Sequence, residues 1–312
     1  MRNFPILWRS FCLCLLIAVA SAASADAPRK PDTVPVPLLW KVSGQDNAVY
    51  LLGSFHLLKS DDYPLSADVE RAFADSRVLM FELAPEDMDS PQVASMMMQA
   101  AMNAGGERLQ DMLSNELWAR LRNYAEGNHF PLSGFTRFKP WFVALTISIT
   151  EMNKQGLDPE LGLDSYFVRA ARQHGKTAMG LELADEQVAL LSGMTMEEQR
   201  QMLSEVLEQA ENGGEEVRTL HAAWRRGDVA MLWDDMAVTM RREYPALYQR
   251  INVDRNDTWI PKIEQRLGGD EGNTLIVVGA LHLLGDDGVV EKLRAKGYRV
   301  ERICSACVNA KP

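Results

Sequence analysis

The sequence predicts an α/β fold: a duplicated, mixed β-sheet core that is flanked by helices and carries helical insertions. A pattern of strand, Gly-x-x-His-Leu-Leu, acidic turn, helix and strand occurs twice, at residues 48–83 and 274–303. Between the two copies the apolar periodicity is mainly helical. Strand–helix–strand units joined by helical stretches are typical of folds in which helices cover the faces of a sheet.

Each expected element follows from its residue pattern. Apolar runs that end at Ser54 and Gly279 predict strands, and residues 44–47 predict the turn before the first of these strands. Ser66 is a candidate cap for the helix that follows. We expect strands at 38–44, 47–54, 77–83, 176–182, 273–279 and 298–303, and helical segments at 66–76, 86–130, 139–153, 163–175, 185–265 and 288–297.

Composition and charge limit the function classes. The chain has 312 residues, 46% of them hydrophobic, and a formal net charge of −10, which allows a sizeable core. A general nucleic-acid binder needs a basic face for the phosphates, and an electrostatic membrane anchor needs a polybasic segment. The acidic balance argues against both.

The first 25 residues have the parts of a secretory signal peptide in the right order. Two arginines accompany an apolar stretch at 11–20, and Ala23-Ser24-Ala25 is an A-x-A cleavage site. An uncleaved anchor is the alternative, but the apolar stretch is shorter than the about 20 residues that span a membrane. We expect cleavage after Ala25, a periplasmic or secreted protein without a stable membrane span, a Pro-rich leader at 26–37 and a single domain at 38–312.

The repeated histidines point to a site at the ends of two strands. An α/β sheet presents its reactive groups just beyond the carboxyl ends of its strands. Gly53 and Gly279 are expected to let the backbone turn sharply there, because glycine accepts a positive φ. His56 and His282, each three residues further on, could then point at one position. A histidine after a single strand is more often an ordinary loop or core residue, and the repetition is what favours a site.

Two glutamates follow other apolar strands and could complete this site. Glu82 ends "VLMFE" and Glu182 ends "AMGLE", so each carboxylate costs energy unless it is paired or ligated. Two histidines and one carboxylate suit a divalent transition metal with open positions. A metal-bound water with a lowered pKa would allow hydrolysis. The alternative for either glutamate is an ion pair with an arginine or a helix cap.

Four cysteines give little sign of redox catalysis. Cys12 and Cys14 leave with the signal peptide, and Cys304 and Cys307 form a C-x-x-C pair five residues from the C-terminus. A thioredoxin-like motif would start a helix after a strand, with more chain to follow. In an exported protein we therefore expect a local disulfide between Cys304 and Cys307.

Taken together, these motifs resemble the TraB/GumN family, which is related to the TIKI proteins, over residues 38–303. The resemblance implies a mixed α/β fold with a duplicated core and one active-site cleft. TIKI proteins are metal-dependent proteases that use Mn²⁺ or Co²⁺, whereas erythromycin-esterase-like and haem-binding ChaN-like proteins share a related fold. The motifs that carry the resemblance are "LLGSFHLL", "LMFEL", "KPWF", "GLD" at 162–164, "GK" at 175–176, "GLE" at 180–182 with Glu186-Gln187, "RN" at 255–256 and "VGALHLLGDDGVVEKLRAKGYRV".

The resemblance implies roles for individual residues. His56, His282 and Glu82 would hold a divalent metal, which could be Mn, Co or Zn, and Glu82 or Glu182 would act as ligand or as general base. Arg255 could steady a developing oxyanion or a carboxylate of the substrate. Asp164 and Asn256 are further site candidates, although Asp164 could simply cap a helix, and Arg255 and Asn256 could lie in a solvated turn.

Two functions therefore remain open. The first is an exported metal-dependent hydrolase, above all a peptidase, whose substrate is a peptide or protein. The alternative is a non-catalytic periplasmic protein that binds and sequesters a peptide or haem. Haem gains little support from the sequence, because no C-x-x-C-H motif is present.

Overall fold

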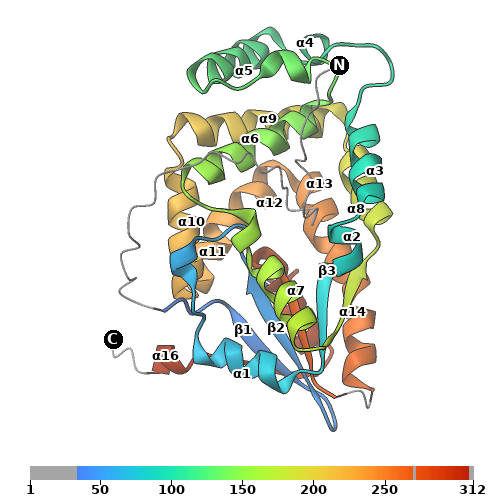
Figure 1. Ribbon diagram of the computed structural model, residues 1–312, viewed down its shortest axis with the longest axis vertical. Helices are drawn as coiled ribbons and strands as arrows, with labels where there is room; N and C mark the ends of the chain where they lie inside the picture. The colour runs from blue at the N-terminus through green and yellow to red at the C-terminus, as the bar shows by residue number, and fades with distance from the viewer. Residues whose placement is uncertain (1–33, 270–271, 309–312) are drawn as a thin grey trace. The chain divides into compact units, whose positions relative to one another are not determined.

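The computed structural model describes residues 34–269 and 272–308 (Figure 1). The expected signal peptide at 1–25 and the first part of the leader lie outside the described residues. Contacts between described residues cluster into two compact units. A helical unit contains residues 86–156 and 184–218, and a sheet unit contains residues 34–85, 157–183 and those from 219 onward. The expectation of a single domain at 38–312 stays a prediction.

The sheet unit is built on one six-stranded mixed sheet, as the sequence predicts. Its strand order is β4-β3-β5-β2-β1-β6. The central strands β4, β3, β5 and β2 run parallel, and β1 pairs antiparallel with both β2 and β6. The strands are β1 (Leu39–Ser43), β2 (Ala48–Ser54), β3 (Val78–Leu83), β4 (Thr177–Glu182), β5 (Thr274–Gly279) and β6 (Arg299–Arg302).

Apolar composition explains which strands lie in the middle of the sheet. Every residue of β2, β3 and β5 is buried, because helices cover both faces of parallel strands and leave no solvent side for an alternating pattern. The edge strand β4 is exposed at its start and buried at its end, in Leu181 and Glu182. These buried ends bring charged side chains into the apolar interior.

The helices of the sheet unit pack against the sheet and connect its strands. The helices of this unit are α1 (Ala67–Asp75), α7 (Leu163–Gln173), α11 (Val229–Trp233), α12 (Thr239–Glu243), α13 (Pro245–Tyr248), α14 (Asp254–Leu267), α15 (Val289–Ala295) and α16 (Ser305–Val308), with most of α10 (Glu215–Arg226). Shorter turns are the 3-10 segments η1 (Ser60–Asp62), η3 (Pro159–Leu161) and η6 (Ala280–Leu283), and the π-helices η4 (Asp234–Val238) and η5 (Gln249–Val253).

The connections that leave β2 and β5 run in opposite directions along the sheet. From β2 the chain passes through α1 to β3, on one side of the sheet order, whereas from β5 it passes through α15 to β6, on the other side. Because such crossovers are right-handed, α1 and α15 cover opposite faces. α7 shares the face of α1, as the contact between Phe73 and Phe167 shows, and lies over the strands in Figure 1. Neighbouring strands whose connections diverge in this way form the usual ligand-binding crevice of α/β sheets.

The helical unit has a core of its own. Leu121 of α5, Ile147 of α6 and Leu203 of α9 are fully buried in one apolar cluster, and α6 and α9 run side by side (Figure 1). This unit is the helical insertion that the sequence predicts. Its elements are α2 (Pro85–Met88), α3 (Pro91–Ala101), α4 (Leu109–Met112), α5 (Asn115–Gly127), η2 (Leu132–Phe135), α6 (Pro140–Lys154), α8 (Ala184–Ser192) and α9 (Met196–Glu211).

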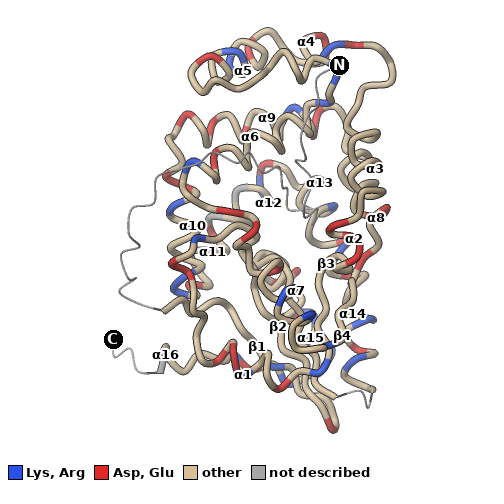
Figure 2. Tube along the Cα trace, in the orientation of Figure 1, with Lys and Arg blue, Asp and Glu red and all other residues tan. Residues whose placement is uncertain are grey.

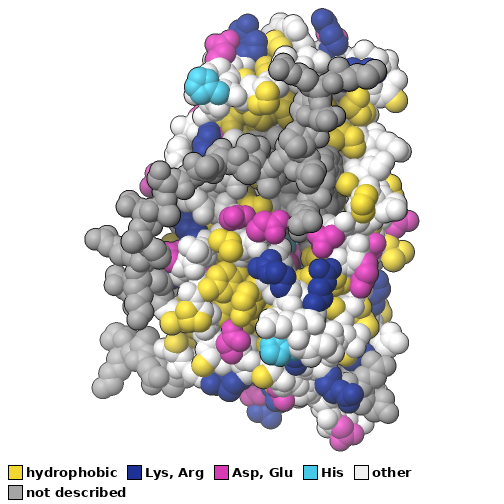
Figure 3. All heavy atoms as spheres, viewed as in Figure 1, with side chains coloured by type: hydrophobic (Ala, Val, Ile, Leu, Met, Phe, Trp, Pro, Cys, Tyr) yellow, Lys and Arg dark blue, Asp and Glu magenta, His cyan; other side chains and the backbone are white. Residues whose placement is uncertain are grey.

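Charges of both signs are mixed along the described part of the chain (Figure 2). On the face seen in Figure 3, acidic, basic and apolar side chains alternate in small groups over the residues that are coloured. No helix among residues 34–269 and 272–308 is long and apolar enough to cross a membrane.

Candidate active site

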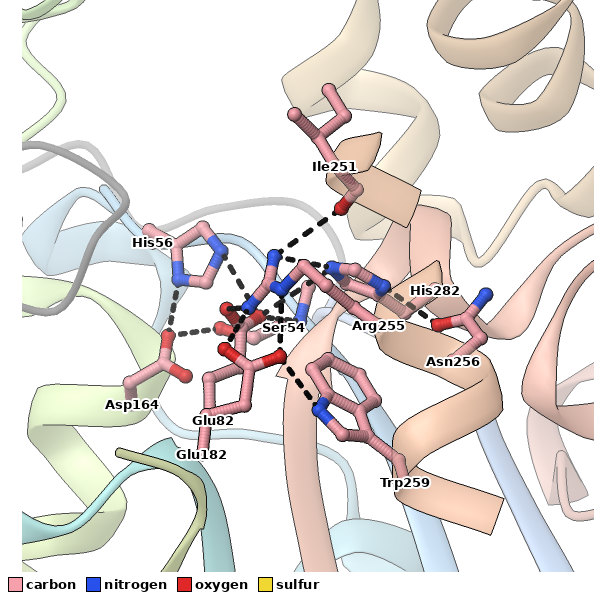
Figure 4. A network of polar contacts seen from close by, with 11 residues as sticks. Ser54, His56, Glu82, Asp164, Glu182, Ile251, Arg255, Asn256, Trp259 and His282 are labelled. Carbon is pink, nitrogen blue, oxygen red and sulfur yellow. Dashed lines mark hydrogen bonds and ion pairs between the residues drawn. The ribbon is translucent and has the colours of Figure 1, made fainter. Parts of the chain in front are cut away.

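The candidate site lies at the carboxyl ends of the four parallel strands (Figure 4). Glu82 is the next-to-last residue of β3 and Glu182 the last of β4. His56 follows β2 by two residues, and His282 lies in η6 directly after β5. Parallel neighbours end at the same edge of a sheet, so residues that are 226 positions apart in the chain meet there.

His56 is oriented by the first turn of α7. Its Nδ1 lies 2.7 Å from Oδ2 of Asp164, and the hydroxyl of Ser54 donates a hydrogen bond to the same carboxylate oxygen. A carboxylate accepts hydrogen bonds, so the Nδ1 of His56 carries a proton. The other oxygen of Asp164, Oδ1, is buried and has no hydrogen-bond partner among the described residues.

His282 is oriented in the same way from α14, on the other face of the sheet. Its Nδ1 lies 2.8 Å from Oδ1 of Asn256. The amide of Asn256 is itself fixed, because its Nδ2 donates to the carbonyl of Asp287 at 2.8 Å. The Nε2 of His282 therefore presents a lone pair. The Trp259 ring packs against this imidazole, with 4.4 Å between ring centroids.

Both imidazoles turn their Nε2 atoms toward Glu82. The Nε2 of His56 lies 3.9 Å, and that of His282 4.0 Å, from Oε1 of Glu82. The backbone N–H of Gly279 donates to the same oxygen at 2.8 Å. A Cβ at Gly279 would lie 3.1 Å from Nε2 of His56 and 3.3 Å from Oε1 of Glu82, so only a glycine leaves this space open.

Arg255 lies between the two glutamates and His282 (Figure 4). Its guanidinium donates to Oε2 of Glu82 at 2.7 Å and to both oxygens of Glu182, at 2.7 and 3.0 Å. Nη1 lies 3.1 Å from Nε2 of His282 and donates also to the carbonyl of Ile251. Its five N–H groups thus face five acceptors. The π-helix η5 directly before α14 fits the frequent occurrence of such bulges at functional sites.

Burial and charge set the protonation of the site. Burial alone would raise the pKa of Glu82, but the charge of Arg255, together with the hydrogen bond from the Gly279 N–H, holds this pKa well below its usual range. Burial and then the charge of Arg255 lower the pKa of His282 to about 3. Against the effect of burial, Glu82 and Glu182 hold the pKa of Arg255 above its usual value. His282 is therefore neutral, and Glu82 ionised, at physiological pH.

The donor set suits a metal chemically, although the side chains do not surround one point. Imidazoles whose Nδ1 is fixed by an acceptor and whose Nε2 faces inward are typical of metal ligands. Atoms that share a metal at about 2.1 Å in tetrahedral geometry lie about 3.4 Å apart, so the observed separations are about half an ångström too wide. In the part of the chain that the structure describes, no group of three or more His, Cys, Asp or Glu is ready to hold a metal.

The structure corrects one expectation, the positive φ of the two glycines, and excludes two of the alternatives. Neither Gly53 nor Gly279 has a positive φ. Gly279 has φ −49°, and the reason for a glycine is the close approach of His56, since a Cβ would lie 3.1 Å from its Nε2. Asp164 is not the cap of α7, since Gly162 precedes the helix and Asp164 holds His56. Arg255 and Asn256 belong to α14 and are enclosed rather than solvated.

Two further residues of the site escape sequence reasoning. Ser54 ends β2 and Trp259 lies one turn after Arg255, where the Trp259 indole N–H donates to Oε1 of Glu182 at 2.7 Å. Ser54 lies within the repeated motif, but the second copy has Ala280 at this place. The helical spacing of Trp259 from Arg255 was the available signal for Trp259. Cys304 and Cys307 are joined in a disulfide away from these residues.

Comparisons with known proteins show the family of the chain. The sequence pattern of the TraB/PrgY/gumN family matches residues 38–302. The chain belongs to this family. It is 24% identical to the uncharacterized protein YbaP of Escherichia coli over 246 residues, which cover 78% of this chain and 87% of YbaP. No solved structure matches the chain.

The chain is also similar to named animal proteases. The chain is 24% identical to the metalloprotease TIKI2 of Danio rerio over 348 residues, covering 93% of this chain and 66% of TIKI2. It is also 24% identical to the human metalloprotease TIKI1, covering 93% of this chain and 67% of TIKI1. This likeness makes hydrolysis a possible activity within the family.

Proposed function

We propose that the protein is an exported, metal-dependent hydrolase that cleaves peptide bonds. The observation that carries the proposal is the convergence of the Nε2 atoms of His56 and His282 on one oxygen of Glu82. Each imidazole has its Nδ1 occupied by an acceptor from a different helix. Such an arrangement presents two neutral nitrogen donors and one carboxylate to a divalent cation.

The charges of the site support the same proposal. Glu82, Asp164 and Glu182 are all buried, and together they carry a formal charge of −3 as carboxylates. Arg255 compensates one of these charges, and Oδ1 of Asp164 has no hydrogen-bond partner among the described residues. Buried excess charge of one sign is costly, and a divalent cation would neutralise it. Mn²⁺, Co²⁺ and Zn²⁺ are all compatible with this donor set.

The residues divide the work as follows. His56, His282 and Glu82 would hold the metal, which when bound would supply a water of lowered pKa and polarise the scissile carbonyl. Asp164 and Asn256 hold the Nδ1 atoms of the two imidazoles, so that each Nε2 is turned toward Glu82. Glu182 accepts hydrogen bonds from Arg255 and Trp259, so its part is to fix Arg255 rather than to accept a proton. Arg255 would donate to a carbonyl or carboxylate oxygen of the substrate once one of its present acceptors gives way.

The test is metal content and peptide cleavage by the mature chain, residues 26–312. The protein is stripped of metal, and Mn²⁺, Co²⁺ or Zn²⁺ is added back over a peptide library. We expect about one metal per chain and cleavage that depends on it, both lost in His56→Ala and His282→Ala. His174→Ala is the matched control, because His174 caps α7 and packs on Phe73. Unchanged metal binding in both site variants would refute the proposal.

The same experiment separates catalysis from binding. A peptide that is retained by the protein but stays intact over long incubation would indicate a sequestering protein instead. Titration with haem provides a second readout, because axial ligation by a histidine shifts the Soret band. Export is proposed from the N-terminal sequence and agrees with the Cys304–Cys307 disulfide, since such bonds persist in oxidising compartments.

A further inference from the structure

We propose that Arg255 is an exchangeable counter-ion. In this structure it holds Glu82 and Glu182 together, and it has to leave His282 before that histidine can bind a metal. The inference rests on the metal site proposed above and adds a feature to it: metal loading and the position of Arg255 exclude one another. Arg255 is thus a positioning residue whose release prepares the site.

The exclusion follows from the single lone pair of His282. Its Nδ1 proton is donated to Oδ1 of Asn256, and the amide of Asn256 cannot turn over without losing its bond to the Asp287 carbonyl. Nε2 therefore has one lone pair. Nη1 of Arg255 lies 3.1 Å from this nitrogen. A guanidinium has donors and no acceptors, so this lone pair serves either Arg255 or a metal.

The contacts of Glu82 point in the same direction. Its Oε1 faces the two histidines and accepts the N–H of Gly279, whereas its Oε2 accepts from Nη2 of Arg255. A divalent cation near Oε1 would repel the guanidinium, which lies against the same carboxylate. Arg255 would then lose its bonds to His282 and Glu82 together.

Glu182 would keep the guanidinium of Arg255 bound after Arg255 leaves His282 and Glu82. It holds the guanidinium through two parallel hydrogen bonds, which is the strongest geometry for such a pair. Glu182 is itself fixed by the indole N–H of Trp259 at 2.7 Å. The Trp259 ring also lies 5.0 Å from the centre of the guanidinium. After exchange, Arg255 would remain anchored on Glu182 and Trp259, with Nη1 free to face a substrate oxygen.

The experiment compares metal affinity in the mature wild-type chain and in Arg255→Met. Isothermal titration with Mn²⁺ measures affinity directly, without reference to activity. Because the variant has no hydrogen bond to break at His282 and no cation next to Glu82, we expect it to bind Mn²⁺ at least about tenfold more tightly. We also expect a lower melting temperature without metal, since two buried carboxylates lose their partner, and a larger increase on adding Mn²⁺ than in the wild type.

Lys262→Met is the matched control. Lys262 lies on the same helix and donates to the carbonyl of Leu181, so its loss removes one positive charge and touches none of the proposed ligands. Its Mn²⁺ affinity should change by less than about threefold, given that exposed charges act weakly at a distance. An equal increase in both variants would show a general charge effect and overturn the exchange.

Other outcomes also decide the question. Weaker or unchanged Mn²⁺ binding in Arg255→Met, with metal bound normally by the wild type, overturns the exchange and leaves the proposed function intact. No binding of Mn²⁺, Co²⁺ or Zn²⁺ by either the wild type or Arg255→Met refutes the proposed function and the exchange together. If Arg255→Met does not fold, Arg255→Lys serves instead, because an ammonium cannot span both glutamates and His282. It should bind Mn²⁺ more tightly than the wild type, and equal or weaker binding overturns the exchange.

Discussion

At the scale of single residues, Gly279 decides whether the site can exist. Its Cα lies among His56, Glu82 and His282, where a methyl group would meet each of them at 3.1 to 3.5 Å. Its backbone N–H also fixes Oε1 of Glu82. The glycine is therefore required by the space that the three side chains share, and its ordinary φ shows that backbone freedom is not the reason.

We predict that Gly279→Ala abolishes metal binding at small cost in stability. The added methyl group displaces Nε2 of His56 or Oε1 of Glu82 while the backbone keeps a conformation that alanine adopts readily. The free energy of unfolding should fall by about 1–3 kcal/mol, as for other overpacked positions. Urea denaturation and titration with Mn²⁺ measure the two effects. Gly134→Ala, where a Cβ meets nothing within 4 Å, should leave both unchanged; metal binding retained by Gly279→Ala would contradict the prediction.

Sequence reasoning found the acidic and imidazole groups of the site because their chemistry is visible in the letters. A histidine or a glutamate after an apolar strand is costly there and therefore conspicuous. It could not tell that Arg255 would bond to Glu82 and Glu182, since that depends on the packing of α14 against strands far away in the sequence. The expected positive φ at Gly279 was wrong for the same reason, because the atoms that surround a glycine come from segments far away in the sequence.

At the scale of elements, each histidine loop is tied down by the acidic residue that follows it. After His56, the buried carboxylate of Asp62 bonds to Nε2 of His221 at 2.8 Å and to the guanidinium of Arg225, both on α10. After His282, the carboxylate of Asp287 accepts from Tyr248 at 3.4 Å and lies 3.7 Å from Arg241. The repeated acidic pair in the sequence thus has an anchoring role in both copies, with the tighter anchor in the first.

We predict that Asp62→Asn destabilises the protein in a pH-dependent way. Burial would raise the pKa of Asp62, but hydrogen bonds and charge from His221, the Lys59 N–H and Arg225 hold it below its usual value. Such a group stabilises the fold above its unfolded pKa of about 3.9, and this stability is lost as pH falls through the lower folded pKa. At neutral pH the variant should lose about 3 kcal/mol of unfolding free energy.

The measurement is urea denaturation of wild type and Asp62→Asn between pH 7 and pH 3. The two unfolding free energies should approach each other at the acid end of this range. Asp287→Asn is the control in the second copy, where the carboxylate is partly exposed, and should cost less than about 1 kcal/mol. A constant difference between wild type and Asp62→Asn down to pH 3 would show that the Asp62 charge is not the cause.

The elements themselves were largely predictable, and their order in the sheet was not. Buried apolar runs bounded by turn residues mark β2, β3 and β5 clearly. Local sequence does not determine that β5 inserts between β2 and β3, because strand order depends on pairing between distant segments. Glu301 takes the place of Glu82 in the second copy of the repeat, but its charged surroundings indicate an exposed residue, and it is exposed on β6, at the far edge beside β1.

At the scale of the whole molecule, the residues that form the site and the helical insertion belong to different units. All of the proposed ligands and the residues that orient them belong to the sheet unit, whereas the helical unit has its own buried cluster. A change of packing in the helical unit should therefore leave the donor atoms of the sheet unit in place. Leu203 of α9 and Val277 of β5 are both fully buried and allow a direct comparison.

We predict that Leu203→Ala and Val277→Ala differ in their effect on metal binding. Leu203→Ala should lower the free energy of unfolding by about 2–5 kcal/mol, from lost burial and a residual cavity, and leave Mn²⁺ affinity within about twofold at temperatures where the chain is folded. Val277 lies two residues before Gly279 in β5. A shift of this strand in Val277→Ala would also move the Gly279 N–H and His282, so the Mn²⁺ affinity of this variant should fall. Circular dichroism in urea and titration with Mn²⁺ measure the two quantities. Equal losses of affinity in both variants would mean that the helical unit supports the donor atoms as directly as the sheet does.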